Sequence, residues 1–344
     1  MSENTKIESC DHTFNPWIGC TKISPGCDHC YAERERASTA LRVVWGAGNP
    51  RHRTAGSTWN KPKRWNAQHA EFFAKHGRRQ RVFCASLSDV FDNAVDSAWR
   101  ADLFRLIADT PNLDWLLLTK RIGNVAAMLR EIGLDRLPDN VWLGSTIVNQ
   151  AEADRDIPKL LEVPARVRFL SMEPLLGPVT FRWASWVDHG AVCKRDGSAH
   201  HLEGLRGIDW VIVGGESGLH GRPMHPDWAR SLREQCAEAG VPFLFKQWGE
   251  WKPICQMDET GDLYRSNRVA KEGENQGVLD ELYGRTCKVE QLCLRIDGEH
   301  APIGSPNAFL AGTSPMQAFK IGKKAAGRLL DGRMHDKFPV EVVA

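Results

Sequence analysis

From residue 81 onward the sequence alternates between short apolar runs and longer amphipathic stretches, and this alternation limits the folds available to the chain. Apolar runs of this length are typical of strands buried on both faces of a parallel sheet. A further strand is expected at residues 13–17. The runs lie at residues 81–85, 114–119, 141–145, 167–171, 209–213 and 241–245.

Helical patterns separate these runs. In residues 97–109, for example, Trp99, Leu103 and Leu106 recur at helical spacing. Strands that alternate with helices at this spacing predict βαβ units, whose right-handed crossovers either close a parallel sheet or wind it doubly. The sequence therefore predicts an α/β fold. The expected helices are residues 31–43, 97–109, 123–132, 149–161 and 227–239.

Two segments interrupt the alternation, at residues 44–80 and 181–207, and we interpret both as insertions. After Trp251 the alternation stops. We therefore expect one domain at 1–251 and an accessory region at 252–344, which ends in a basic helix at 315–330.

Composition excludes several classes of protein. No run approaches the roughly 20 apolar residues that span a bilayer, and no signal-peptide pattern begins the chain, so we expect a cytoplasmic protein without membrane contact. The 344-residue chain has ten cysteines, too dispersed for a secreted disulfide scaffold. Its net charge of +2 rules out polyanion binding by bulk charge but leaves room for a local basic groove.

Three cysteines are crowded into one short segment, where Cys20, Cys27 and Cys30 follow the spacing C-x6-C-x2-C. Three thiolates from one loop can bind three irons of a cubane cluster and leave the fourth iron without a protein ligand. An open metal position suits a reaction, whereas a structural site is closed by protein ligands. The spacing therefore favours a catalytic iron–sulfur cluster.

Structural zinc is the alternative interpretation. It needs a fourth ligand, for which His29, His12 or Cys10 is available. Zinc usually takes its ligands in two separated pairs, and Cys287 with Cys293 forms only a loose second pair. A non-catalytic, zinc-stabilised binding module stays open on this evidence.

In a barrel of parallel strands the working residues lie at the carboxyl ends of the strands. Lys120 suits a carboxylate, ribose or phosphate. Glu173 and Glu216 are the best candidates to bind ribose hydroxyls, an amine or a substrate. Polar residues or glycines stand at successive strand ends: Ser86, Ser88, Lys120, Ser145, Glu173, Gly214, Gly215 and Glu216.

The segment 13–20, with the sequence Thr-Phe-Asn-Pro-Trp-Ile-Gly-Cys, is followed by Cys27, Cys30, Tyr31 and Ala32. This pattern resembles a phage-type family of radical S-adenosylmethionine proteins. The resemblance covers most of the chain and includes residues 118–121, 171–175, 214–218 and 322–328. Members are often encoded beside a three-Cys-motif partner protein, which the resemblance makes a possible partner here.

The resemblance implies a partial (βα)6 TIM-like barrel with insertions and a C-terminal extension. It implies a 4Fe-4S cluster on Cys20, Cys27 and Cys30, whose open iron binds S-adenosyl-L-methionine, and an electron donor such as flavodoxin or ferredoxin. Cleavage of the sulfonium would give a 5′-deoxyadenosyl radical. From their places at the strand ends we expect Lys120, Glu173 and Glu216 to be the catalytic residues. We expect the cofactor to contact His29 and Tyr31 beside the third cysteine and the strand-end residues Ser86, Ser88, Ser145, Glu173, Gly214, Gly215 and Glu216.

The substrate is left open between two classes. Basic residues interleave with Trp59 and Trp65 between positions 51 and 65, and the C-terminal segment is also basic, a pattern that can follow a phosphate backbone. A solvated surface explains the same pattern. Radical chemistry on a nucleic acid or nucleotide is the first hypothesis, and radical modification of a partner protein is the second.

Overall fold

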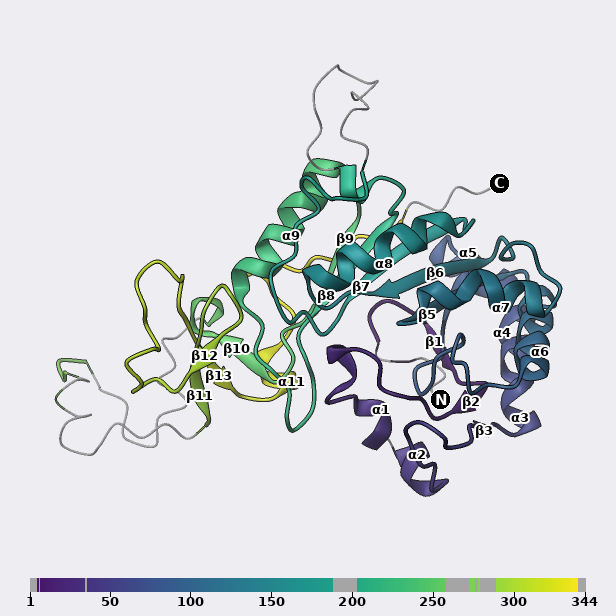
Figure 1. Cartoon of the computed structure of the whole chain (residues 1–344), viewed down its shortest axis with the longest axis horizontal. Helices are drawn as coiled ribbons and strands as arrows, with labels where there is room; N and C mark the ends of the chain where they lie inside the picture. The colour runs from purple at the N-terminus through teal and green to yellow at the C-terminus, as the bar shows by residue number, and fades with distance from the viewer. Residues whose placement is uncertain are drawn as a thin grey trace, which may run out of the picture.

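The computed structural model describes residues 5–339, apart from residues 6, 35, 188–202, 258–271, 276–277 and 279–288. Its centre is a curled sheet of seven parallel strands in the order β1-β4-β5-β6-β7-β8-β9, which follows the chain and leaves the half-barrel open between β1 and β9 (Figure 1). The predicted α/β half-barrel is confirmed. The strands are β1 (His12–Phe14), β4 (Gln80–Cys84), β5 (Leu113–Thr119), β6 (Val141–Thr146), β7 (Val167–Met172), β8 (Trp210–Gly214) and β9 (Phe243–Gln247).

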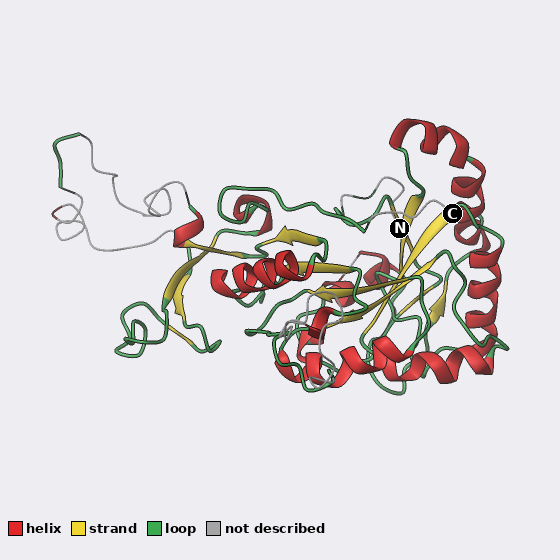
Figure 2. Cartoon of the chain, turned by 90° about the horizontal axis from the view of Figure 1, so that it is seen from above, coloured by secondary structure: helices red, strands yellow, loops and turns green. Residues whose placement is uncertain are grey.

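Helices cover the outer face of this sheet (Figure 2). They are α6 (Ser97–Ala108), α7 (Val125–Glu131), α8 (Gln150–Glu162) and α9 (Pro226–Ala239), each close to its predicted range. Local capping sets their ends: the Asp96 side chain accepts from the backbone N–H of Ala98 at the start of α6, and Gly240, at φ 69°, ends α9.

The two faces of the strands belong to two separate apolar clusters. Val82, Leu117 and Leu143 face outward and pack in the main core that the helices cover. The inward-facing side chains form a smaller cluster inside the curl, beneath the cavity at the carboxyl ends of the strands. Its buried members are Leu116, Trp142, Val167, Phe169, Trp210, Ile212 and Leu244.

The segment 44–80, predicted as an insertion, contains the helical crossover from β1 to β4. It forms β3 (His52–Arg53), α3 (Gly56–Trp59), α4 (Lys61–Ala67) and α5 (His69–His76). Pro62 lies in the first turn of α4, where its missing N–H costs nothing, so it begins a helix instead of marking a loop. The fully buried Trp65 stacks on His12 at a ring distance of 4.1 Å.

The first expected strand and the helix after it are shorter than predicted. Residues 13–17 divide into β1 and β2 (Trp17–Ile18), and β2 pairs with β3 instead of joining the large sheet. The helix expected at 31–43 is present as α1 (Tyr31–Arg34) and α2 (Arg36–Ala40).

A second, antiparallel sheet follows the half-barrel, in the order β10 (Trp251–Pro253), β13 (Met316–Lys320), β11 (Gln291–Leu294), β12 (His300–Ala301). The prediction of a helix at 315–330 is therefore wrong. Its first part is β13, and only the short α11 (Lys323–Ala326) is helical. Gly322 and Gly327 flank α11 at φ 83° and 70°, conformations that interrupt a longer helix.

The chain then returns to the half-barrel. The backbone N–H of Phe245 donates to the carbonyl of His335 at 2.9 Å, and the indole of Trp210 donates to that of Lys337 at 2.9 Å. The accessory region expected at 252–344 thus contributes both a separate sheet and a segment of the half-barrel. Most of the second predicted insertion, 181–207, lies outside the described residues. Among the residues that are described, no helix is both long and apolar enough to cross a membrane.

Gly144 provides a test of the inner cluster. A Cβ at this position would lie 2.3 Å from the ring of Phe169, so Gly144→Ala should lower the free energy of unfolding by about 1–3 kcal/mol through overpacking. Gly56→Ala is the matched control, because its Cβ would meet nothing within 4 Å. Chemical denaturation of both variants measures the difference, and equal stability would contradict this packing.

Candidate active site

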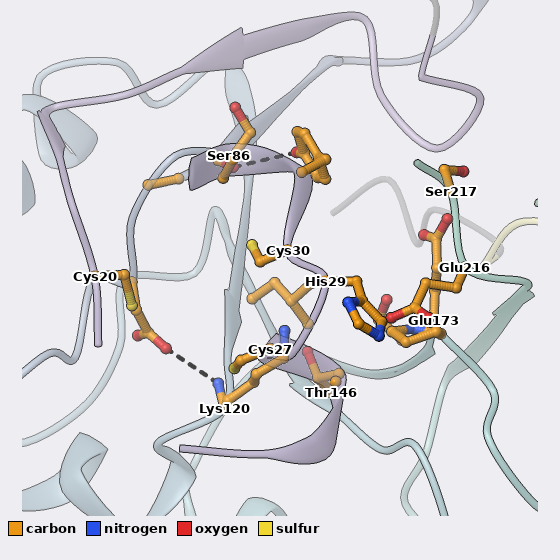
Figure 3. A pocket seen from close by; sticks show the side chains of 18 of the residues that line it. Cys20, Cys27, His29, Cys30, Ser86, Lys120, Thr146, Glu173, Glu216 and Ser217 are labelled. Carbon is orange, nitrogen blue, oxygen red and sulfur yellow. Dashed lines mark hydrogen bonds between the residues drawn. The ribbon is translucent and has the colours of Figure 1, made fainter. Parts of the chain in front are cut away.

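A cavity of about 450 Å³ opens at the carboxyl ends of the strands, within the size range of small-molecule sites (Figure 3). Its wall combines the cysteine-bearing loop, residues 20–30, with residues that follow successive strands. Most of the residues predicted from the sequence line it: Cys20, Cys27, His29, Cys30, Tyr31, Ser86, Ser88, Lys120, Glu173, Gly215 and Glu216.

The cavity wall does not include two predicted residues, Ser145 and Gly214. Successive strand residues point to opposite faces. Ser145 shares its face with Leu143, on the helix-covered side, so the next residue, Thr146, lines the cavity instead. Thr146 is 1% exposed, and its hydroxyl has no hydrogen-bond partner within the described residues.

Gly215 does line the cavity, but packing already explains why a glycine stands there. A Cβ on Gly215 would lie 1.9 Å from the carbonyl oxygen of Trp248. The backbones after β8 and β9 approach each other too closely for any side chain. The glycine is therefore required whether or not a ligand approaches it.

The cysteine-bearing loop has one short 3-10 turn, η1 (Pro25–Cys27), and owes its shape to outside contacts. Ser24 accepts from the backbone N–H of Gly26 at 3.1 Å and donates to Glu152 of α8 at 2.6 Å. The other oxygen of Glu152 accepts from the backbone of Val148 at 3.0 Å. The amino end of α8 thus holds the middle of the loop.

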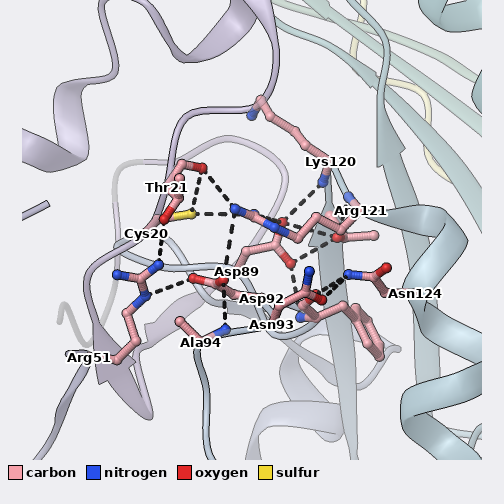
Figure 4. Close-up of polar contacts among 12 residues, drawn as sticks. Cys20, Thr21, Arg51, Asp89, Asp92, Asn93, Ala94, Lys120, Arg121 and Asn124 are labelled. Carbon is pink, nitrogen blue, oxygen red and sulfur yellow. Dashed lines mark hydrogen bonds and ion pairs between the residues drawn. The ribbon is translucent and has the colours of Figure 1, made fainter. Parts of the chain in front are cut away.

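Two buried arginines hold the Cys20 end of the loop (Figure 4). Arg121, which follows β5, donates to the Sγ of Cys20 at 3.4 Å and to the carbonyl of Thr21 at 2.7 Å. It also pairs with Asp89 at 3.1 Å. Burial raises the pKa of the Cys20 thiol to about 11, an effect that the Arg121 charge opposes. A metal bound here would displace the thiol proton.

Arg51 is the second arginine that holds the Cys20 end of the loop. Its Nε donates to Asp92 at 2.7 Å and its Nη2 to the hydroxyl of Thr21 at 2.7 Å. The Arg51 and Asp92 side chains are only 1% and 4% exposed. Arg51 was one of the basic residues expected to follow a phosphate backbone, but its charge is used inside the protein.

A third arginine, Arg222, holds the Cys27 end. It forms a bidentate pair with Glu216, with Nε–Oε2 and Nη2–Oε1 distances of 2.8 and 2.7 Å. The same guanidinium donates to the carbonyl of Pro25 at 2.8 Å and to the Asp28 carboxylate at 3.2 Å. Glu216 is 6% exposed and its charge is already neutralised.

Glu173 lies at the end of β7 and pairs with Lys246 at 2.5 Å. Gln247 donates to its other oxygen at 2.8 Å. Burial opposes ionisation of Glu173, but Lys246 and Gln247 hold the pKa of its carboxyl below the usual value. Glu173 is therefore ionised at neutral pH and keeps 19% of its side chain exposed toward the cavity.

The polar side chains near the cysteines differ in whether they already form hydrogen bonds within the protein. Ser86 accepts from the amide of Asn15 at 2.9 Å, and Ser88 donates to the carbonyl of Trp17 at 3.0 Å. The hydroxyl of Tyr31 donates to the Ser86 carbonyl at 3.1 Å, while its side chain stays 52% exposed. His29 packs against the ring of His220 at 5.8 Å.

Two lysines stand out by contrast. Lys120, from the end of β5, and Lys323, from α11 in the C-terminal region, both line the cavity. Within the part of the chain that the structure describes, neither ammonium group has a hydrogen bond or ion pair. The C-terminal region thus contributes a positive charge to a cavity formed mainly by the half-barrel.

Cys20, Cys27 and Cys30 place three thiols on one cavity wall, the number and type of ligands that a cubane cluster with one open iron takes. The described residues contain no group of three His, Cys, Asp or Glu arranged around one metal position, which a zinc site requires. In a cubane cluster each cysteine binds a different iron, so the three sulfurs need not share one ion. The arrangement of Cys20, Cys27 and Cys30 on one cavity wall satisfies that weaker condition (Figure 3).

Sequence reasoning missed Arg51, Arg222 and Glu152 as parts of this site. Arg222 contacts residues that precede it by 194 and 197 positions, and Glu152 contacts one that precedes it by 128. The one available signal was Arg222 itself, a charged residue in the loop that follows Glu216.

The model of a family described as "Protein of unknown function (DUF5131)" matches residues 4–339. No curated protein matches the chain. Among solved structures, a mutant of spore photoproduct lyase is 12% identical with a TM-score of 0.37, over 82% of this chain and 73% of that one. A form of the lyase with bound AdoMet and dinucleoside spore photoproduct is 11% identical with a TM-score of 0.34, over 79% and 69%. Likenesses this distant carry no argument, and the site stands on its own geometry.

Breaking the Arg51–Asp92 pair tests the support of the Cys20 end. Arg51→Gln leaves the buried Asp92 carboxylate with only its longer ion pair to Arg121, at 3.9 Å, and should cost about 3 kcal/mol of unfolding free energy. Arg136→Gln is the control, because its pair with Asp139 has side chains 69% and 77% exposed. Denaturation curves of the two variants that agreed within error would contradict the buried pair.

Proposed function

Because the chain belongs to the DUF5131 family, whose function is unknown, we propose a function from the site itself: a radical S-adenosylmethionine enzyme with a 4Fe-4S cluster on Cys20, Cys27 and Cys30. The observation that carries the proposal is that one loop brings three thiols to a cavity at the carboxyl ends of a half-barrel. Three protein ligands leave one iron of a cubane cluster open.

When bound, the cluster would supply the electron that splits the sulfonium of S-adenosylmethionine and yields a 5′-deoxyadenosyl radical. The residues of this chain bind and orient. Arg121 donates to the Sγ of Cys20 and stabilises its thiolate form. The exposed ring of Tyr31 and the imidazole of His29 offer flat surfaces for adenine.

Polar contacts to the cofactor would come from residues at the ends of the strands. Lys120 has a free ammonium group suited to the methionyl carboxylate. The ionised Glu173, held by Lys246, suits the methionyl amine or a ribose hydroxyl. Thr146, with its buried and unpartnered hydroxyl, adds a hydrogen bond that the sequence did not predict.

For the substrate we propose a nucleotide or nucleic acid. Of the basic residues between positions 51 and 65, Arg51 and Arg53 pair with carboxylates of the protein itself, so that segment gives less support than expected. The support comes instead from Lys323, an unpaired and exposed cation at the cavity wall. A phosphate oxygen is a suitable partner for such a group.

The cofactor proposal is tested by turnover. Anaerobic reconstitution with iron and sulfide, followed by reduction and S-adenosylmethionine, should give 5′-deoxyadenosine, measured by chromatography. Cys27→Ala should abolish both iron–sulfur absorbance and product, since it removes a cluster ligand. Cys255→Ala is the matched control, because Cys255 is exposed and does not line the cavity. Colourless protein that binds stoichiometric zinc would refute the proposal.

The substrate proposal is tested by salt dependence. Fluorescence anisotropy with a single-stranded oligonucleotide should show that Lys323→Gln weakens binding and lowers the salt slope by about one. Lys324→Gln, a change at the next residue, which does not line the cavity, should have the smaller effect. Binding that is absent, or insensitive to salt, would instead favour a protein substrate.

A further inference from the structure

We infer that Arg222 is a positioning residue for Cys27 and Cys30, and that the C-terminal sheet supports it through Glu250 and Trp251. The inference extends the proposed function, since it concerns how the proposed ligands are held. It also changes the interpretation of Glu216, which then acts through Arg222 instead of touching cofactor or substrate.

The contacts of Arg222 converge on the segment between Pro25 and Asp28. This segment contains Cys27, and the backbone N–H of Cys30 donates to the Cys27 carbonyl at 3.3 Å. The Arg222 guanidinium therefore helps to fix the turn that carries Cys27 and leads to Cys30, together with Glu152, which holds Ser24 at the start of that turn. Its own orientation is fixed by Glu216, which also accepts from the backbone N–H of Arg222 at 2.8 Å.

The loop that carries Arg222, residues 215–222, is held in turn by the residues that follow β9. Glu250 accepts from the backbone of Gly218 at 2.8 Å and donates its own N–H to the Glu216 carbonyl at 3.0 Å. The indole of Trp251 donates to the Gly221 carbonyl at 2.6 Å. Trp251 is the first residue of β10, so this support belongs to the C-terminal sheet.

The backbone around these contacts leaves no space for rearrangement. A Cβ on Gly249, whose φ is +81°, would lie 2.2 Å from the carbonyl oxygen of Glu216. A Cβ on Gly221 would lie 2.7 Å from the same oxygen. The two loops therefore pack backbone against backbone, a geometry that transmits the position of β10 to Arg222.

The other end of the cysteine-bearing loop depends on different residues. Cys20 and Thr21 are held by Arg121 and Arg51, neither of which contacts Arg222 or its loop. The two ends should therefore loosen independently. Loss of Arg222 should affect Cys27 and Cys30 and leave Cys20 as it was, an outcome that a general loss of stability would not produce.

The experiment measures alkylation of each cysteine in the metal-free 344-residue chain by mass spectrometry, with the exposed Cys255 as the internal reference. Arg222→Gln should speed the labelling of Cys27 and Cys30 about tenfold, because it removes several charged hydrogen bonds. Cys20 should be unchanged. Arg182→Gln is the matched control, as it breaks the surface pair with Glu238. Equal labelling of Cys27 and Cys30 in Arg222→Gln and the unmodified protein would overturn the inference.

Two further variants keep the test informative if Arg222→Gln folds poorly. Trp251→Phe removes only the indole donor to Gly221. It should speed the labelling of Cys27 and Cys30 to a smaller extent than Arg222→Gln does. Trp228→Phe removes an equivalent bond, to the Ile296 carbonyl at 2.7 Å, and should leave them unchanged. Identical labelling of Cys27 and Cys30 in these two variants would overturn the part played by the C-terminal sheet.

Glu216→Gln tests whether Glu216 acts through Arg222. If it does, the double variant Glu216→Gln/Arg222→Gln should label Cys27 and Cys30 no faster than Arg222→Gln alone. Additive effects would overturn that assignment. Because all labelling is done without metal, these outcomes stand apart from the proposed function, which is tested on the unmodified protein by cluster formation and S-adenosylmethionine cleavage.

Discussion

The site depends on arginine–carboxylate pairs, fully buried at Arg51 and Arg121, that fix a loop with almost no regular structure of its own. Arg121 and Arg51 hold its beginning and Arg222 its end, while Glu152 holds Ser24 in between. Arg121, Arg222 and Glu152 lie in segments that follow a strand or begin a helix of the half-barrel. Arg51 does not, but it pairs with Asp92, which lies in such a segment. The curvature of the sheet therefore determines where the three thiols lie.

The sheet could be predicted because burial on both faces gives parallel strands continuous apolar sequences. The strand β6 could be predicted in this way even though its end is polar, because Ser145 and Thr146 are fully buried there. The C-terminal region could not be predicted in the same way. The lysines of residues 320–324 suggested a basic helix, but Gly322 and Gly327 adopt positive φ, and β13 gains its stability by pairing with two distant strands.

The position of the site was predictable, but most of its contacts were not. Parallel strands bring their carboxyl ends together, so Lys120, Glu173 and Glu216 were expected at one edge. Which oxygen or nitrogen each residue meets depends on pairs far apart in sequence, such as Glu173 with Lys246. Ser145 was misplaced for a different reason, since an error of one residue in a strand exchanges its two faces.

The central claim is that Cys20, Cys27 and Cys30 hold a cluster with one iron open to S-adenosylmethionine. Electron paramagnetic resonance of the reduced, reconstituted protein tests it most directly. The account predicts a cluster signal whose line shape changes when S-adenosylmethionine is added, because the cofactor binds the open iron. A cluster signal that is unaffected by saturating S-adenosylmethionine, or that persists in Cys27→Ala, would contradict the account.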